Sequence, residues 1–469
     1  MYFCLRQIYL KSGGLFATVE NRYVCKGQPM SEASEVPRQL LRTRIVTFAD
    51  GERFPLLLGK DGVPHAMATL FVTTQIRNAS KAPNTMLAAL GAIRGLLVWA
   101  EVRHVDLEQR FLTRLFLTGA EIESLRVTTQ LRHDAREYSV AHAAVIPPTY
   151  PKVPGTSRRT ESVRAVSSKA SGTVGLSTQY IKLSYIAQYL RWLGNHLLES
   201  SPQSESTGKR TFEQMIGCLL GSRPQPRRRC PSLARHGLDS ASQMALAELI
   251  RPTASINPFS ETVQNRNALI VRILGELGIR AGELLALKVS DFDFQCNEVV
   301  IARRHGDPTD PRANQPVAKT LDRRLPVSES LARQIFEYVL NERRHYRAAK
   351  RHAFLLVTHR PGPYCGQPLS AKGLAKIFGT LRCADPAHLA FISPHILRHT
   401  VNDRFSELMD ARRIRDPNEE KMRSYFMGWR EGSGSAATYM RRHIEGKARE
   451  AALKLQEDIL CGEVRRGEH

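Results

Sequence analysis

The sequence has 469 residues, more than one hydrophobic core usually spans, so we expect two or three domains. Hydrophobic residues make up 42% and charged residues 24% of the chain, which is typical of a globular protein and excludes fibrous and wholly disordered classes. Lysine and arginine outnumber aspartate and glutamate by 68 to 45, and the net charge of +23 makes a polyanion, nucleic acid before an anionic membrane, the first partner to consider.

The first half of the chain changes character near residue 64. Residues 1–63 form an N-terminal extension of unknown role with β-prone runs at residues 44–48 and 54–58. Residues 64–200 are predicted to form a helical domain. Apolar residues between 86 and 98 recur at helical spacing, and Asn84 or Thr85 is suited to cap that helix.

Later in this half, a second helix is expected over about residues 178–198. The stretch 147–175, rich in proline, serine, glycine and basic residues, predicts an exposed loop between the two helices.

Nothing in the sequence predicts a membrane segment. The apolar start of the chain is interrupted by Arg6 and no small-residue cleavage site follows it, so we expect no signal peptide. Residues 87–100 contain Arg94 and are expected to be too short to cross a bilayer. The eight cysteines include no C-x-x-C pair, which favours reduced thiols in a cytoplasmic protein.

The second half is predicted to be one domain of residues 236–469, reached through a basic linker over residues 201–235. The capping residues, helical periodicity and β-prone runs together predict a mainly α fold with a small β-sheet, an α+β class. The expected elements are a helix capped by Asp239 or Ser240, a helix over 267–277 ended by Gly278, strands over 298–303 and 323–327, and helices that begin near Ser328, Ser370 and Pro394.

Two short segments of this domain carry arginines suited to phosphate chemistry. In Gly-Ile-Arg-Ala-Gly-Glu-Leu-Leu, Arg280 and Glu283 are three residues apart and would share a helical face. In Pro-His-Ile-Leu-Arg-His, His395 and Arg398 have the same spacing. A guanidinium group matches two phosphate oxygens and a histidine moves protons, although a surface ion pair or a structural histidine explains either segment alone.

Two further segments add a lysine and a tyrosine. Lys319-Thr320 precedes Arg-Arg-Leu-Pro at the tip of the predicted hairpin, where a flexible lysine can give a proton to a leaving oxygen. Met-Gly-Trp429 is followed by a glycine and serine loop and then by Thr438-Tyr439. A phenol ionises near pH 10, so it needs neighbouring cations to act as a nucleophile at neutral pH.

The ordered set of arginine with glutamate, lysine at a hairpin, His-x-x-Arg and tyrosine resembles the catalytic domain of tyrosine recombinases, the phage integrase family. The resemblance covers about residues 236–455 and includes the residues that flank each matched position, such as His-Ile-Leu-Arg-His-Thr. Residues 64–200 are similar to the helical core-binding domain that clamps DNA in this family.

The resemblance implies a role for each matched residue. Arg280 and Arg398 would clamp the scissile phosphate, and His395 would assist proton transfer. Lys319 would protonate the leaving 5′ oxygen, and Glu283 would support Arg280.

The same resemblance makes Tyr439 the nucleophile of a site-specific recombinase or integrase, often encoded by mobile elements, that joins itself to a 3′ phosphate. Trp429 stands where most of the family has histidine, and the interval from it to Tyr439 is one residue longer than usual. The resemblance further implies double-stranded DNA as the partner, a homo-tetramer on paired sites, and no metal ion or cofactor.

Other functions remain open at this stage. A type IB topoisomerase shares the chemistry, and a non-catalytic DNA-binding protein can share the fold. RNA binding has only the charge in its favour. The tail after Tyr439 has helix-spaced apolar residues between 448 and 459, which suit either a neighbouring protomer or the tail's own domain.

Overall fold

The computed structural model describes residues 41–131, 173–198, 206–225, 237–304, 306–316, 320–414 and 416–432. Nearer the C-terminus it describes residues 434, 436, 439–440, 443–445, 447–448 and 451–457. We call residues 41–225 the N-terminal part and residues 237–457 the C-terminal part, and describe each by itself.

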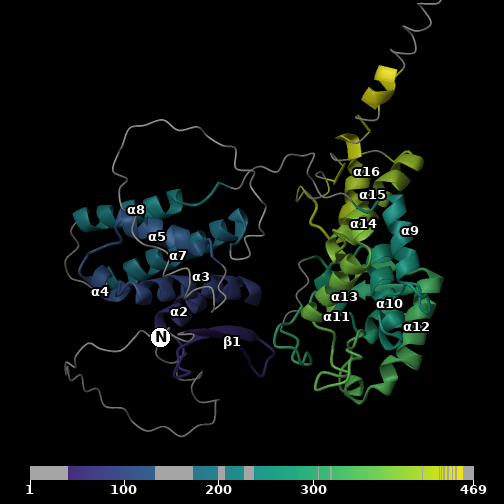
Figure 1. Cartoon of the computed structure of the whole chain (residues 1–469), viewed down its shortest axis with the longest axis horizontal. Coiled ribbons are helices and arrows are strands. Elements are labelled where there is room, and N and C mark those ends of the chain that lie inside the picture. The colour runs from purple at the N-terminus through teal and green to yellow at the C-terminus, as the bar shows by residue number, and fades with distance from the viewer. Residues whose placement is uncertain are drawn as a thin grey trace, which may run out of the picture. The chain divides into compact units, whose positions relative to one another are not determined.

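The N-terminal part is a helical bundle with one β-hairpin (Figure 1). The hairpin pairs its two strands antiparallel, with Arg42 opposite Leu58, and its second strand packs on α3. Its elements are β1 (Arg42–Thr47), β2 (Arg53–Leu58), α2 (Ala66–Phe71), η1 (Val72–Arg77), α3 (Pro83–Val102), α4 (Leu107–Leu112), α5 (Gly119–Thr129), α7 (Leu176–Leu198) and α8 (Ser206–Gly221).

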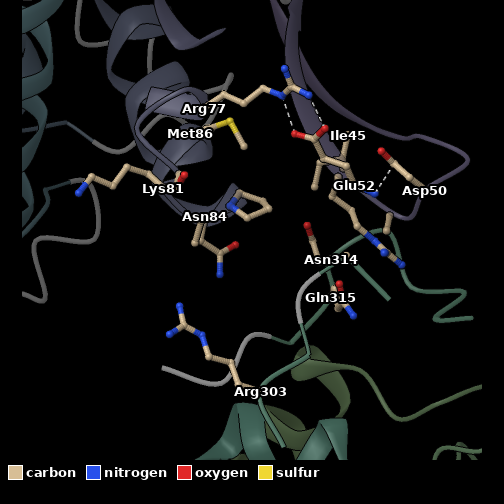
Figure 2. Close-up of a pocket in the computed structure, with 16 residues that line it drawn as sticks. Ile45, Asp50, Glu52, Arg77, Lys81, Asn84, Met86, Arg303, Asn314 and Gln315 are labelled. Carbon is tan, nitrogen blue, oxygen red and sulfur yellow. Dashed lines mark hydrogen bonds and ion pairs between the residues drawn. The ribbon is translucent and has the colours of Figure 1, made fainter. Parts of the chain in front are cut away.

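One hydrophobic core holds this part together. It runs from Phe54 on β2 to Leu219 on α8, and Trp99 of α3 lies fully buried within it. The indole N–H of Trp99 donates a hydrogen bond to the hydroxyl of Ser124 at 3.1 Å, so its polar group is not left unmatched. At the surface, Arg77 donates two hydrogen bonds of 2.6 Å to Glu52, which ties η1 to the hairpin (Figure 2).

Helix α3 differs from the sequence prediction at its start and in its length. It begins at Pro83, whose fixed φ suits a first helical position, and no side chain caps it, so the predicted cap by Asn84 or Thr85 was wrong. The helix has 20 residues and is, by length and composition alone, long and apolar enough to span a membrane. The prediction that this apolar segment is too short to cross a bilayer was therefore wrong. Half of the apolar window is buried inside the protein, where it forms the core described above.

The C-terminal part is mainly helical and contains a three-stranded sheet of order β3-β4-β5. Helix α10 packs against both α12 and α15 (Figure 1). The elements are α9 (Ser240–Leu249), α10 (Glu261–Leu277), α11 (Ala281–Ala286), η3 (Val289–Asp291), β3 (Phe292–Asp293), β4 (Glu298–Ile301), β5 (Arg323–Pro326), α12 (Glu329–Asn341), η4 (Arg343–His345), η5 (Arg347–Arg351), α13 (Ala371–Ala384), α14 (Pro386–Leu389), α15 (Pro394–Ala411) and α16 (Asp416–Met427).

The core of this part is built around α10, whose inward face is apolar. Leu269, Ile270 and Leu274 are fully buried and belong to a cluster that reaches from Leu246 to Leu397. The antiparallel pairing of β4 with β5 places Val299 opposite Leu325, and both side chains are buried in the same cluster. The sheet and α10 therefore share one core.

The predicted fold class, mainly α with a small β-sheet, is confirmed. Asp239, Ser328 and Ser370 each accept a hydrogen bond from the backbone at the start of the predicted helix. The two predicted strands form and pair with each other. The predicted loop over residues 147–175 falls almost entirely outside the described residues, and the proposed domain boundaries stay a prediction.

Replacing Phe212 tests whether α8 belongs to the core of the N-terminal part. The ring is buried and makes edge-to-face contact with Phe111, 5.9 Å between centroids. We expect Phe212→Ala to lower the free energy of unfolding by about 3–5 kcal/mol, because it removes buried apolar contacts and leaves a cavity. Urea denaturation measures this. Leu112→Ala, at a side chain 56% exposed, is the control, and equal losses for the two variants would contradict the assignment.

Candidate active site

The turn between α10 and α11 fixes the backbone of Arg280. Gly278 ends α10 with φ of +60°, and a β-carbon there would come within 2.9 Å of the Val401 side chain, so only glycine suits the position. Arg280 follows as the N-cap of α11 in an extended conformation, and its backbone N–H donates to Glu283 at 3.1 Å. Glu283 therefore meets Arg280 by capping the helix rather than across a shared helical face.

A buried carboxylate holds three groups together. Glu283 accepts a hydrogen bond of 2.9 Å from Arg323 and one from the hydroxyl of Thr320, and its other contact is Arg280, at 3.6 Å. The side chains of Glu283 and Arg323 are 0% and 1% exposed. Burial would raise the pKa of Glu283, but the Arg323 guanidinium and the hydrogen bonds hold this pKa below its ordinary value. The carboxylate is thus ionised and its charge is largely matched by Arg323.

Arg280 is left with unused donor capacity. Its side chain is 35% exposed, yet its Nη1 atom is buried and has no hydrogen-bond acceptor among the described residues. Burial lowers its pKa, and although Glu283 acts in the opposite direction, the charge of Arg323 adds to the lowering. A buried cationic donor without an acceptor favours an anion beside it.

Arg398 lies near the start of α15 and is 2% exposed. Its guanidinium donates to the carbonyl of Gly278 at 2.6 Å and to that of Met427 at 2.8 Å, which joins α10 to the end of α16. Burial, and next the positive charge of Arg280, lower its pKa to about 9. Arg398 therefore stays charged at neutral pH and shares an anion-favouring environment with Arg280.

Trp429 and Tyr439 stack beside this pair of arginines. The two rings lie 5.3 Å apart with 20° between their planes, and the guanidinium of Arg398 lies 5.5 Å from the Trp429 ring. Tyr439 influences the pKa of both Arg280 and Arg398, which places its phenol within their electrostatic reach. Tyr439 thus lies beside both predicted phosphate-binding arginines.

Gly428 permits this approach. Its φ is +66°, and a β-carbon there would lie 2.6 Å from the Arg323 guanidinium. The loop that follows contains two further glycines with positive φ, Gly432 and Gly434, in the interval that the sequence predicts to be one residue longer than usual.

The two histidines of α15 occupy different environments. His395 is exposed, whereas His399, one turn later, is 7% exposed, and their rings meet edge to face at 4.3 Å. The Nδ1 atom of His399 lies 2.8 Å from the hydroxyl of Tyr439. The structure therefore brings Arg280, Glu283, Arg398, Trp429 and Tyr439 together with His399, and places His395 at the edge of the group.

Three residues at the site were not assigned a role from the sequence. One residue that was assigned a role cannot be placed. Lys319 is outside the described residues. Arg323, Thr320 and His399 were missed as site residues, although each had a signal. Arg323 shares one face of a strand with the buried Leu325, where an arginine requires a buried partner. His399 stands four residues after His395 and so on the same helical face.

The arrangement suits the binding of one phosphodiester between two guanidinium groups with a phenol alongside. Over the described ranges, no three histidine, cysteine, aspartate or glutamate residues gather in a way that would hold a metal ion.

Residues 252–416 match the model of the phage integrase family, which encloses Arg280, His395 and Arg398. Over these residues the chain matches that family, the tyrosine recombinases, which confirms the resemblance seen in the sequence. A comparison with curated proteins finds no match.

Solved structures give weaker similarity. The chain is similar to XerH site-specific recombinase bound to palindromic difH substrate, at 13% identity, over 84% of this chain and 94% of that one, with a TM-score of 0.38. It is similar to XerA recombinase at 15% identity, over 81% and 92%, with a TM-score of 0.29. It is similar to the Tn1549 transposon integrase in complex with circular intermediate DNA at 17% identity, over 55% of this chain and 74% of that one, with a TM-score of 0.35. The family assignment rests on the sequence match.

Removing the partner of Glu283 tests the charge network. We expect Arg323→Met to lower the free energy of unfolding by about 3–5 kcal/mol, because it leaves a buried carboxylate without its main counter-ion. The double variant Glu283→Gln/Arg323→Met should recover much of this loss, since no buried charge remains unpaired.

Urea denaturation at neutral pH is the measurement, and Arg333→Met, which breaks an exposed pair with Glu329, is the control. The control should change stability by less than about 1 kcal/mol. The same small change in Arg323→Met would show that the network does not hold the site.

Proposed function

We propose that the protein is a site-specific DNA recombinase that cuts and rejoins strands through a 3′-phosphotyrosyl intermediate at Tyr439. The observation that carries this proposal is the meeting of Arg280, Arg398, Trp429 and Tyr439, which come from separate segments of the chain. They surround a buried Arg280 nitrogen for which the described part of the chain offers no acceptor. A phosphate that bridges the two arginines would fill that need and present its phosphorus to the phenol.

In the proposed reaction, the oxygen of Tyr439 attacks the scissile phosphorus as the bond from phosphorus to the 5′ oxygen breaks. Arg280 and Arg398 stabilise the charge that grows on the non-bridging oxygens, and the indole N–H of Trp429 is available to do the same. Lys319 donates a proton to the departing 5′ oxygen. The bond energy is kept in the phosphotyrosyl link, so a second 5′ hydroxyl reverses the attack without a nucleotide or a metal ion.

Double-stranded DNA is the proposed partner, supported by the net charge of +23 and by the family. We further propose a cytoplasmic protein in which residues 64–200 serve as the core-binding domain and four protomers assemble on two sites. Residues 451–457 are helical and exposed, with Leu453 50% and Leu455 62% exposed, and thus offer apolar side chains to a neighbouring protomer.

Loss of the phenolic oxygen should abolish the covalent intermediate. On a nicked suicide duplex selected by binding from a random pool, wild-type protein should form an adduct that survives a denaturing gel, and Tyr439→Phe should form none. Tyr425→Phe is the matched control, since that exposed tyrosine lies on α16 with its hydroxyl bound to the Arg324 carbonyl. Specific binding with no adduct in wild type would favour the non-cutting alternative.

Chelation should leave the chemistry intact. We expect the adduct to form at the same rate in EDTA as without it, because arginine and lysine supply the charge stabilisation. A strict Mg²⁺ requirement for cleavage would contradict the mechanism. Relaxation of a supercoiled plasmid without the selected site would favour the topoisomerase, and preference for RNA over duplex DNA at fixed salt would favour the RNA-binding alternative.

A further inference from the structure

We propose that His399, rather than His395, accepts the proton of Tyr439 when the phenol attacks. This inference rests on the proposed recombinase function and names a catalytic residue within it. Its basis is contact with the reacting oxygen, since Nδ1 of His399 lies 2.8 Å from the Tyr439 hydroxyl. A general base must lie within about 2.6–3.2 Å of the group that it deprotonates.

The surroundings of His399 hold its ring in one place. The residue is 7% exposed on the inward face of α15, next in sequence to Arg398. Its ring centroid lies 5.3 Å from that of Tyr439 and 4.3 Å from that of His395. The phenol is in turn fixed from another side by its stacking on Trp429, so donor and acceptor are both oriented before DNA arrives.

The charges around this pair favour transfer. Arg280 and Arg398 both interact electrostatically with Tyr439, and a positive charge beside the phenol stabilises a phenolate. They disfavour an imidazolium, but the scissile phosphate would bring a negative charge to the same place. Bound DNA would therefore permit His399 to become charged at the moment when the phenol must lose its proton.

The step is balanced. The phenolic O–H bond breaks and its proton joins Nδ1 of His399, which requires the tautomer with hydrogen on Nε2. The phenolic oxygen bonds to phosphorus, and the leaving 5′ oxygen takes a proton from Lys319. In the reverse step, the 5′ hydroxyl gives its proton to Lys319 as it attacks phosphorus, the bond from phosphorus to the tyrosine oxygen breaks, and His399 returns its proton to the phenol. The exposed His395, whose ring contacts that of His399, remains available to interact with the phosphate.

The test is the pH dependence of single-turnover cleavage by the full-length chain on the nicked duplex. Wild type should lose rate as the pH falls through the imidazole range, about pH 6.5 for an unperturbed histidine, since a protonated base accepts nothing. His399→Ala should be about 10²–10⁴-fold slower, and its rate should no longer fall near that pH, which we call the loss of the acidic limb. Added imidazole should restore part of the rate. His395→Ala should keep the limb.

Two variants separate a base from a residue that only positions the tyrosine. His399→Asn keeps a hydrogen-bonding group near the phenol but takes no proton, so it should be as slow as His399→Ala. His388→Ala is the control and should behave as wild type, because that histidine is exposed and pairs with Asp385. A His399→Asn enzyme within a few-fold of wild type would reduce His399 to positioning and overturn the proposal.

A substrate with sulfur in place of the bridging 5′ oxygen provides a second measurement, because the sulfur leaves without a proton. It should relieve Lys319→Ala but not the His399 variants, and relief of His399→Ala would overturn the proposal. A flat wild-type profile between pH 5 and 8 would do the same whatever the variants' folding. If wild type forms no adduct, the proposed function itself fails; if it does and the limb follows His395, only this inference fails.

Discussion

The site depends on one buried carboxylate that holds more positive charge than it can neutralise. Glu283 binds Arg323 directly and lies 3.6 Å from Arg280, and burial together with the positive charge of Arg280 lowers the pKa of Arg398 to about 9. Burial of several cations around one anion is costly unless another anion joins them. In the proposed function a phosphodiester of DNA supplies that charge, so binding of DNA would also complete the site.

Backbone geometry brings this charge together from distant segments. The carbonyl of Gly278 and that of Met427 both accept hydrogen bonds from Arg398, which fixes the ends of α10 and α16 to the start of α15. Gly428 can lie against Arg323 because it has no side chain. A β-carbon at this position would collide with the guanidinium of Arg323. Trp429 follows Gly428 directly and stacks on Tyr439, so the proposed nucleophile contacts the residue next to this turn.

The sequence predicted elements whose boundaries depend on local chemistry, and missed those that depend on tertiary contacts. Asp239 capped its helix and Gly278 ended α10 as expected, because each signal lies within a few residues. The polar first turns of α10 and the two-residue strand β3 carry too little periodicity to be seen. At the site, residue types and order indicated Arg280, Arg398 and Tyr439. The partners Arg323 and His399 needed a structure, because their roles depend on which side chain each one meets.

Mass spectrometry of the trapped protein and DNA complex tests the central claim most directly. The chain contains thirteen tyrosines, and among those that the structure describes Tyr439 stacks on Trp429 beside Arg280 and Arg398. After digestion, the nucleotide-bearing peptide should contain Tyr439 with the phosphate on its phenolic oxygen. A nucleotide on Tyr425 or on any residue other than Tyr439 would contradict the account.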